Sequence, residues 1–531
     1  MTAHDALDFD FVIVGAGSAG CVLANRLSAG GRHRVALLEA GGDASSFFVR
    51  MPIGYGKIAF EPGLSWHYFS GPEPGLDDRR VLLPRGKGLG GSSNINGLIY
   101  IRGQAADYAD WVAAGATGWD WPDVLPWFLK SELRVQKATE KDSTNDAVIA
   151  AFAATGTPVT DSFNDGSQWG SGYYDAIIQG GERWSAARVF LNPIKDRDNL
   201  EIYTTAVARR LIFERGDAGV RVSAVECDLG GVRTLLRARR EVILAAGAYH
   251  SPQLLQLSGV GDARLLGRHG ISVVLDRPTV GANLQDHYVV PMGFRVRPGV
   301  FSYNGELAGW GLLRNLWRYL RRRSGPLTIP AAQSGAFVIS DRSQQRPDLQ
   351  YHCLPVTGDL EIAAKGGKGA LSKYPGLTIA PCVTRPASRG EVAIAATDPL
   401  TPPHIVHRYL VAEIDQEITV RGMRIAREVA AARPLASLIE AEAAPGEIAR
   451  SDAELLEFAR KYGSTGYHPV GTCRMGSDPA AVVDPQLRVQ GIAGLRVADA
   501  SVMPTLISGN THAACVMIGE RAAAFLLRDA Q

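Results

Sequence analysis

The sequence feature that most constrains the fold lies between Asp8 and Gly41. A short, apolar, β-branched run over residues 8–14 ends in Gly15-Ala16-Gly17-Ser18-Ala19-Gly20, and apolar side chains then recur at helical spacing over residues 22–27. A second apolar run, over residues 34–38, ends in Glu39. Strand, glycine turn, helix and strand in this order predict a βαβ unit that carries a dinucleotide-binding fingerprint.

Each part of this unit has a physical role. Gly15 permits the tight turn, Gly17 lets the backbone approach a pyrophosphate, and Gly20 brings the helix close to the strand. The helix N-terminus presents unpaired N–H groups and a positive dipole end to the phosphates. Glu39 lies at the tip of the second strand, where a carboxylate can accept hydrogen bonds from ribose hydroxyls. The motif therefore predicts a bound dinucleotide, but it does not distinguish NAD from FAD.

The length and composition limit the class of protein. A chain of 531 residues is too long for one core and is expected to form two intergrown domains. Its net charge of +2 gives no reason to expect nucleic acid as a partner. The six cysteines form no CxxC pair, which argues against a disulfide framework and suits a reducing cytosol. His250, His287 and His404 lack the spacing of metal ligands, so we predict no metal site.

The same reasoning predicts a cytoplasmic protein. The first strand begins within about ten residues of Met1, which leaves no room for a secretory peptide. No uninterrupted apolar run reaches the roughly 18–20 residues that span a bilayer.

One stretch, Trp310–Leu320, suggests a possible peripheral membrane contact. The apolar residues of this stretch, together with Leu307 just before it, form one helical stripe flanked by arginines. The stripe consists of Leu307, Trp310, Leu313, Trp317 and Leu320. A basic amphipathic helix can lie on a lipid surface. More often such a stripe packs on its own domain while the arginines are solvated, and we favour this second interpretation.

A second glycine-rich segment covers Pro84–Gly97. It has five glycines in fourteen residues, together with two hydroxyls and two amides. Such a loop can wrap backbone N–H groups around an anion or a planar polar ring. A merely flexible loop is the alternative, but the apolar run Leu98–Ile101 anchors its far end. Further along, Ser251 followed by Pro252 predicts the N-cap and first position of a helix.

Two polar residues stand out near the C-terminus. His468 lies between a predicted helix and another glycine turn, and Asn510 follows Gly509 just before a final predicted helix over residues 511–527. A lone histidine in a loop is usually structural, so its position alone only weakly favours a catalytic role.

Four blocks, taken together, resemble the glucose–methanol–choline (GMC) family of flavin oxidoreductases. They are Gly15–Gly20 with Glu39, Pro84–Asn96, Gly247–Gly261 with Ser251-Pro252-Gln253, and His468 with Asn510. They follow the family's order over nearly the whole chain. Within the family, Arg85-Gly86-Lys87 and Asn283–His287 look most like choline dehydrogenases and bacterial alcohol dehydrogenases.

This resemblance implies an α/β fold with a Rossmann-like FAD-binding domain and an inserted α+β substrate-binding domain that contains an antiparallel sheet. The FAD-binding domain would be discontinuous and comprise residues 1–155, 200–300 and 465–531. The substrate-binding domain would comprise residues 156–199 and 301–464.

The resemblance also implies that the dinucleotide is FAD. The pyrophosphate is expected on Gly15, Gly17, Ser18 and Ala19, and the ribose on Glu39. The flavin is expected on Ser92, Asn96, Gly97 and Ile99, and the adenine on Val207. The other expected cofactor-binding residues are Gly20, Asp499, Ala500, His512 and Ala513. The family more often has Asn-Ala-Pro where His512-Ala513-Ala514 stands here. Some members bind FAD covalently through a histidine whose matching position here is Ile95, so we predict non-covalent FAD.

The implied reaction is oxidation of a primary alcohol to an aldehyde. His468 would act as the general base, and Asn510 would donate a hydrogen bond to the developing alkoxide. Oxygen or another acceptor would reoxidise the flavin. One alternative is a non-redox lyase of the cyanohydrin-cleaving type on the same scaffold. Another is a non-catalytic nucleotide-binding or membrane-associated module built on the βαβ unit and the Trp310–Leu320 helix.

Overall fold

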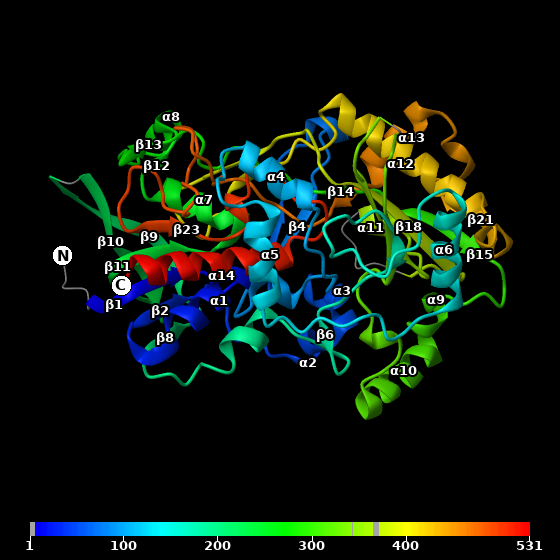
Figure 1. The fold of residues 1–531 in the computed structure, drawn as a ribbon, viewed down its shortest axis with the longest axis horizontal. Helices are drawn as coiled ribbons and strands as arrows, with labels where there is room; N and C mark the ends of the chain where they lie inside the picture. Colours follow the sequence, from blue (N-terminus) through cyan, green and yellow to red (C-terminus); the bar gives the residue numbers. More distant parts are fainter. Residues whose placement is uncertain (1–5, 218, 342, 365–370, 531) are drawn as a thin grey trace.

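The computed structural model describes residues 6–217, 219–341, 343–364 and 371–530. The elements are arranged around two sheets, which occupy the two halves of the molecule in Figure 1. β1 (Ala6–Val14), α1 (Ser18–Leu27) and β2 (Val35–Leu38) form the predicted βαβ unit, and β1 pairs with β2 in parallel.

The first sheet combines strands from the beginning, middle and end of the chain. Its order is β8-β2-β1-β11-β10-β9, with β23 paired to β11. The pairs among β8, β2, β1, β11 and β23 are parallel, whereas β10 is antiparallel to both β11 and β9. The further strands are β8 (Leu200–Tyr203), β9 (Val207–Gly216), β10 (Gly219–Leu229), β11 (Val232–Leu244) and β23 (Leu495–Val497).

The last helix, α14 (His512–Asp529), packs against the first helix, α1. A Cβ atom on Gly519 would lie 3.0 Å from the Cα atom of Ala19, so the missing side chain allows this close approach. Arg26 on α1 donates to Glu520 on α14 at 2.7 and 3.0 Å. The chain therefore returns at its end to the phosphate-binding helix predicted at its beginning.

The expected N-cap at Ser251 is wrong, because α7 (Gly247–Leu257) begins four residues earlier. Ser251 instead accepts the backbone N–H of Ala246 from inside the first turn. Pro252 has no N–H to offer to the carbonyl of Ala248, which accepts the hydroxyl of Thr472 at 2.7 Å instead. A contact that is distant in sequence thus satisfies the group that the proline leaves free.

The second sheet is antiparallel in all its described pairs, with order β21-β15-β18-β17-β16-β5 and with β14 bridging β18 and β22. Its core faces α12 (Glu413–Ala431) and α6 (Ser143–Ala154). The predicted fold class is therefore confirmed. The strands are β5 (Gly170–Tyr173), β14 (Tyr288–Val289), β15 (Met292–Val296), β16 (Ser334–Val338), β17 (Leu349–Leu354), β18 (Gly376–Val383), β21 (Ile439–Ala444) and β22 (Ser464–Thr465).

The domain boundaries stay a prediction. β14 and β15 pair into the second sheet although they precede residue 300, so the chain enters this sheet earlier than the predicted division.

The remaining elements surround the two sheets. The short strands are β3 (Ser65–Phe69), β4 (Leu82–Gly86), β6 (Ile178–Gln179), β7 (Glu182–Arg183), β12 (Val260–Gly261), β13 (Leu275–Asp276), β19 (Glu391–Ala393) and β20 (His404–Val406). The helices are α2 (Phe47–Arg50), α3 (Tyr55–Ile58), α4 (Ala105–Ala113), α5 (Trp121–Lys130), α8 (Ala263–Arg268), α9 (Tyr303–Glu306), α10 (Gly309–Arg322), α11 (Leu360–Ala364) and α13 (Asp452–Tyr462). Among the described residues, no helix combines the length and apolar character needed to cross a bilayer.

Candidate functional site

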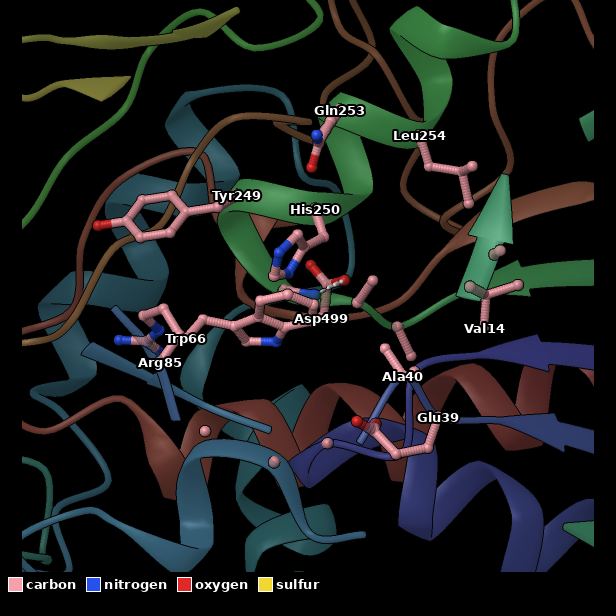
Figure 2. Close-up of a pocket in the computed structure, with 18 of the residues that line it drawn as sticks. Val14, Glu39, Ala40, Trp66, Arg85, Tyr249, His250, Gln253, Leu254 and Asp499 are labelled. Carbon is pink, nitrogen blue, oxygen red and sulfur yellow. Dashed lines mark hydrogen bonds between the residues drawn. The ribbon is translucent and has the colours of Figure 1, made fainter. Parts of the chain in front are cut away.

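A cavity of about 1220 Å³, partly open to solvent, lies at the carboxyl ends of the parallel strands. Its lining includes Val14 and Leu38, the last residues of β1 and β2, and Ala245, which follows β11. Ligands of open α/β sheets bind at this edge. Figure 2 shows Glu39 on one side of the cavity and Asp499 on another, with Trp66, Arg85 and His250 gathered toward one end.

The first glycine turn is built for close contact. Gly15 has a φ of +102°, and a Cβ atom there would lie 2.6 Å from the carbonyl oxygen of Ala245. A Cβ atom on Gly20 would lie 1.9 Å from the carbonyl oxygen of Gly15, which explains why helix and strand need glycine here. A Cβ atom on Gly91 would lie 2.8 Å from the Cα atom of Gly17. The two glycine-rich segments are therefore in direct contact.

Glu39 connects these two segments. Its buried carboxylate accepts the backbone N–H of Ala16 at 3.0 Å and those of Gly41 and Gly88, both at 2.9 Å. Burial raises the pKa of Glu39, while the three backbone N–H groups oppose that rise. Because a carboxylate has about four lone-pair sites, these bonds leave one site for a ligand hydroxyl.

Asp499 has a corresponding role on the opposite side. Its carboxylate accepts the N–H of Gly247 at 2.8 Å, the hydroxyl of Ser251 at 2.6 Å and the N–H of Ser501 at 2.8 Å. It therefore joins the start of α7 to the segment that follows β23.

The structure brings most, but not all, of the predicted cofactor residues to the cavity. Those that line it are Gly15, Gly17, Ser18, Ala19, Glu39, Ser92, Val207, Asp499 and Ala500. The predicted residues outside its lining are Gly20, Asn96, Gly97, Ile99, His512 and Ala513.

His512 is nevertheless connected to the cavity through Ser18, whose hydroxyl lies 2.8 Å from its Nδ1 atom. Burial, followed by the charge of Arg183, lowers the pKa of His512 to about 4. Its Nε2 atom is buried and has no hydrogen-bond partner among the described residues. A neutral imidazole with one free nitrogen thus lies beside the phosphate-binding turn.

His468 and Asn510, the predicted catalytic pair, lie side by side although 41 residues separate them in the sequence. The Nδ2 atom of Asn510 lies 3.1 Å from Nε2 of His468, and the Oδ1 atom of Asn510 accepts Gln350 at 3.4 Å. The amide of Asn510 therefore donates to the imidazole. Neither residue belongs to the lining of the large cavity, but Arg85, which does, donates to the carbonyl of Tyr467.

The hydrogen-bond network assigns the tautomer of His468. The Nε2 atom of buried His287 lies 2.9 Å from the carbonyl oxygen of Thr384, which can only accept, so this nitrogen carries the proton. The unprotonated Nδ1 of His287 then accepts from Nδ1 of His468, 2.9 Å away. In this tautomer the Nε2 atom of His468 is unprotonated, and its lone pair accepts the N–H of Asn510.

The surroundings also keep His468 neutral. Burial, followed by the neighbouring charges of His287, His352 and Arg85, lowers the pKa of His468 well below its ordinary value. The backbone N–H of His468 donates to Asp286 at 2.7 Å. This contact fixes the loop that presents the imidazole.

The sequence analysis did not identify several polar residues of this region. His287 was set aside because it lacks the spacing of a metal ligand. His352 and Gln350 share one face of β17, and the Nδ1 atom of His352 and the Oε1 atom of Gln350 are buried without partners among the described residues. The alternation of polar residues in a strand was the available signal, because it places both on the same face.

Arg183 was also missed. Its guanidinium is 1% exposed and donates to the Oδ1 atom of Asn96 at 2.7 Å and the carbonyl of Ser93 at 3.1 Å. Burial lowers its pKa to about 9. No sequence motif signalled it, since β7 is only two residues long. Within the described part of the chain, no group of three His, Cys, Asp or Glu residues is arranged to hold a metal ion.

A parallel sheet with a phosphate-binding turn, a second antiparallel sheet and an imidazole–amide pair together define a dinucleotide-dependent oxidoreductase of two-sheet architecture. The chain belongs to the GMC oxidoreductase family, whose N-terminal model matches residues 9–289 and whose C-terminal model matches residues 386–519. Enzymes of this family bind FAD.

Relatives of known name resemble the chain over its whole length. The alcohol dehydrogenase [acceptor] of Pseudomonas putida is 40% identical, with 98% of this chain and 96% of that protein covered. The oxygen-dependent choline dehydrogenase of Rhizobium etli is 38% identical, with coverage of 98% and 95%.

Solved structures agree. Pyridoxine 4-oxidase from Mesorbium loti has a TM-score of 0.86 at 30% identity, with 97% of this chain and 98% of that chain covered. A variant of the formate oxidase of Aspergillus oryzae has a TM-score of 0.91 at 26% identity, with 99% of each chain covered.

Replacing Glu39 by Gln should destabilise the protein even without a ligand. An amide offers one acceptor atom and turns its NH₂ group toward N–H donors, so at least one of three backbone donors is left unpaired. We expect the free energy of unfolding in urea to fall by about 1–3 kcal/mol. The control is Glu447→Gln, whose side chain is 92% exposed and should leave the urea midpoint unchanged. An unchanged midpoint for Glu39→Gln would contradict the role given to this carboxylate.

Proposed function

We propose that the protein oxidises a primary alcohol to an aldehyde, with FAD as the resident cofactor and His468 as the general base. The observation that carries this proposal is the hydrogen-bonded tautomer of His468. It leaves the lone pair of Nε2 on the side where the amide of Asn510 lies.

The residues of the cavity fit FAD. The glycine turn brings the backbone close to the position where a pyrophosphate would lie, and Ser18 and the start of α1 supply donors for it. Glu39 keeps a free acceptor site for a ribose hydroxyl. The unpartnered Nε2 of His512 offers one more polar contact. Bound FAD would supply the acceptor for the hydride that leaves the alcohol carbon.

We further propose that FAD is held without a covalent bond. Ile95, which matches the position of the histidine that some family members use, has no nucleophilic atom. The 3₁₀ turn Gly91–Asn94, immediately before it, carries only hydroxyl and amide side chains.

His468 would take the proton of the alcohol hydroxyl. Its imidazole is neutral because burial and the neighbouring histidines and arginine disfavour the cation. His287 holds the proton of His468 on Nδ1, so that Nε2 remains the basic atom. Removing the hydroxyl proton raises the electron density on the carbinol oxygen and makes the carbon a better hydride donor.

Asn510 would position the substrate oxygen. Its Nδ2 group already donates to Nε2 of His468, so an alcohol hydroxyl placed between them would receive one donor and one acceptor. The same amide would stabilise the oxygen as its negative charge develops. Arg85 adds positive potential near the base, which also favours an alkoxide.

The names of the relatives indicate only the class of electron acceptor that reoxidises FAD. One relative is described as an alcohol dehydrogenase [acceptor] and another as an oxygen-dependent choline dehydrogenase. We propose oxygen or another electron acceptor as the oxidant for this chain, and a primary alcohol as the substrate.

Acid precipitation tests the mode of FAD attachment. Because Ile95 supplies no nucleophile, denaturation should leave all of the yellow colour in the supernatant. Flavin that stays with the precipitated polypeptide would contradict the non-covalent assignment.

Anaerobic mixing with alcohols tests the reaction. A panel of aliphatic, aromatic and quaternary-ammonium alcohols should include substrates that bleach the flavin absorbance. The His468→Ala variant should bleach more slowly by about 10²–10⁴-fold while its flavin content stays unchanged. The control variant is His404→Ala, an exposed histidine on β20. A flavin spectrum that no alcohol changes, with cyanohydrin cleavage instead, would favour the lyase.

The pH dependence tests the protonation state of His468. Its folded-state pKa lies well below 6.5, so the neutral, basic form persists at pH 6.5 and is lost only at lower pH. The acidic limb of kcat/KM should therefore lie below pH 6.5. An acidic limb at or above pH 6.5 in the wild type would contradict the assigned environment of this imidazole.

A further inference from the structure

The helix α10 presents an exposed apolar stripe, contrary to the packing expected from its sequence. Its exposed fractions are 87% for Trp310, 57% for Leu313 and Trp317, and 56% for Leu320. The interpretation that this stripe packs on its own domain is therefore wrong. In Figure 1 the helix stands at the lower edge of the molecule, away from both sheets.

The exposure is not a consequence of a loosely held helix. On its opposite face, Asn315 and Tyr319 are buried, and Leu316 packs against a cluster formed with Met51 and Leu327. The amide of Asn315 donates to the carbonyl of Glu306 at 2.9 Å. One face of α10 thus anchors the helix, and the other keeps its large apolar side chains in solvent.

The charge of the helix is of one sign. Gly309–Arg322 contains four arginines and no acidic residue. Arg314 pairs with Glu306 at 2.6 Å and Arg318 with Glu140 at 3.4 Å. In the part of the chain that the structure describes, Arg321 and Arg322 have no carboxylate partner.

Helical geometry places Arg321 beside the apolar stripe, whereas Arg322 lies about 120° from Trp310, toward the face that holds Asn315. At 100° per residue, Arg314 and Arg321 lie within about 40° of Trp310 around the helix axis. The guanidinium of Arg321 lies 5.2 Å from the ring centroid of Trp317. On the adjacent α2, Phe48 is also exposed, and the amine of Lys57 lies 3.7 Å from its ring centroid. The exposed surface of α10 therefore has an apolar stripe with cationic side chains beside it.

We propose that α10 docks the enzyme on an anionic lipid surface, with the helix axis parallel to the membrane plane. Exposed tryptophans and leucines would enter the boundary between headgroups and acyl chains, and Arg321 would contact lipid phosphates. A span across the bilayer is not implied, because α10 has only 14 residues.

A second copy of the chain fits this surface less well than a lipid surface does. A second copy would bring no negative charge to Arg321 from the same helix, because α10 has no acidic residue. An anionic bilayer supplies negative charge and an apolar layer at the same depth. The charge of the helix therefore selects the lipid surface.

Vesicle flotation of the full-length, FAD-loaded enzyme tests this proposal. Vesicles of phosphatidylcholine with phosphatidylglycerol should bind the wild type, and pure phosphatidylcholine should bind it less. Since an arginine near an anionic surface contributes about 1 kcal/mol, R321E should lower the partition coefficient for anionic vesicles by about fivefold or more. W310S/W317S should lower binding to both kinds of vesicle.

Matched variants on another surface provide the control. R239E/R240E changes two adjacent exposed arginines of β11, and V232S/L129S removes two side chains that are each 64% exposed. Both control variants should float like the wild type. All four variants should keep the flavin absorbance of the wild type, since none of the changed residues lines the cavity.

Three results would overturn the proposal. The first is a wild-type enzyme that does not float with anionic vesicles. The second is W310S/W317S or R321E binding as the wild type does. The third is light scattering that shows a dimer which W310S/W317S converts to a monomer, with no vesicle binding by either form. That outcome would assign the stripe to contact between copies of this chain.

Discussion

The buried carboxylate of Glu39 is the contact on which the cofactor side of the molecule depends. Three backbone N–H groups from three separate positions converge on it, at Ala16, Gly41 and Gly88. Because backbone donors carry no flexible side chain, this contact fixes the main chain itself. The first glycine turn and the second glycine-rich segment are thereby held against each other, and Gly91 can approach Gly17 this closely because Gly91 has no side chain. Main-chain atoms of the two glycine-rich segments thus form this side of the cavity.

The chemical side depends on a different connection, the segment Asn283–His287 between the two sheets. Asn283 and Gln285 donate to the carbonyl of Pro504, and Gln285 accepts the N–H of Leu506. The next two residues contact His468. Asp286 accepts the backbone N–H of His468, and His287 accepts its ring N–H. One short segment therefore positions His468 and the loop before Asn510 together. Its own position is set by the antiparallel pair of β14 with β22 and β18.

Local signals predicted the βαβ unit and the final helix near residues 511–527, because periodicity and glycine spacing are properties of short segments. The start of α7 was not predictable in this way. Ser251-Pro252 has the local pattern of a helix start, but Thr472 satisfies the carbonyl that the proline leaves free, and Asp499 holds the preceding turn. Arg183 and the pairing of His287 with His468 depend on contacts that are 87 or more residues apart, which no short motif encodes.

The apolar stripe of α10 shows that sequence periodicity has the same limit when it is used to predict a surface. Its spacing predicts correctly which side chains share a face, but periodicity does not say what covers that face. In this chain Asn315 and Tyr319, both polar, point inward, whereas Trp310 and Trp317 point to solvent. Asn315 is tolerated in the interior because Glu306 supplies its partners from α9. The inward face is thus satisfied by hydrogen bonds and a small apolar cluster, and the larger apolar face is left exposed among the residues that the structure describes. The polar side chains of α10 therefore face the interior, and its large apolar side chains face solvent. This arrangement is expected of a helix whose apolar face binds a surface outside its own domain.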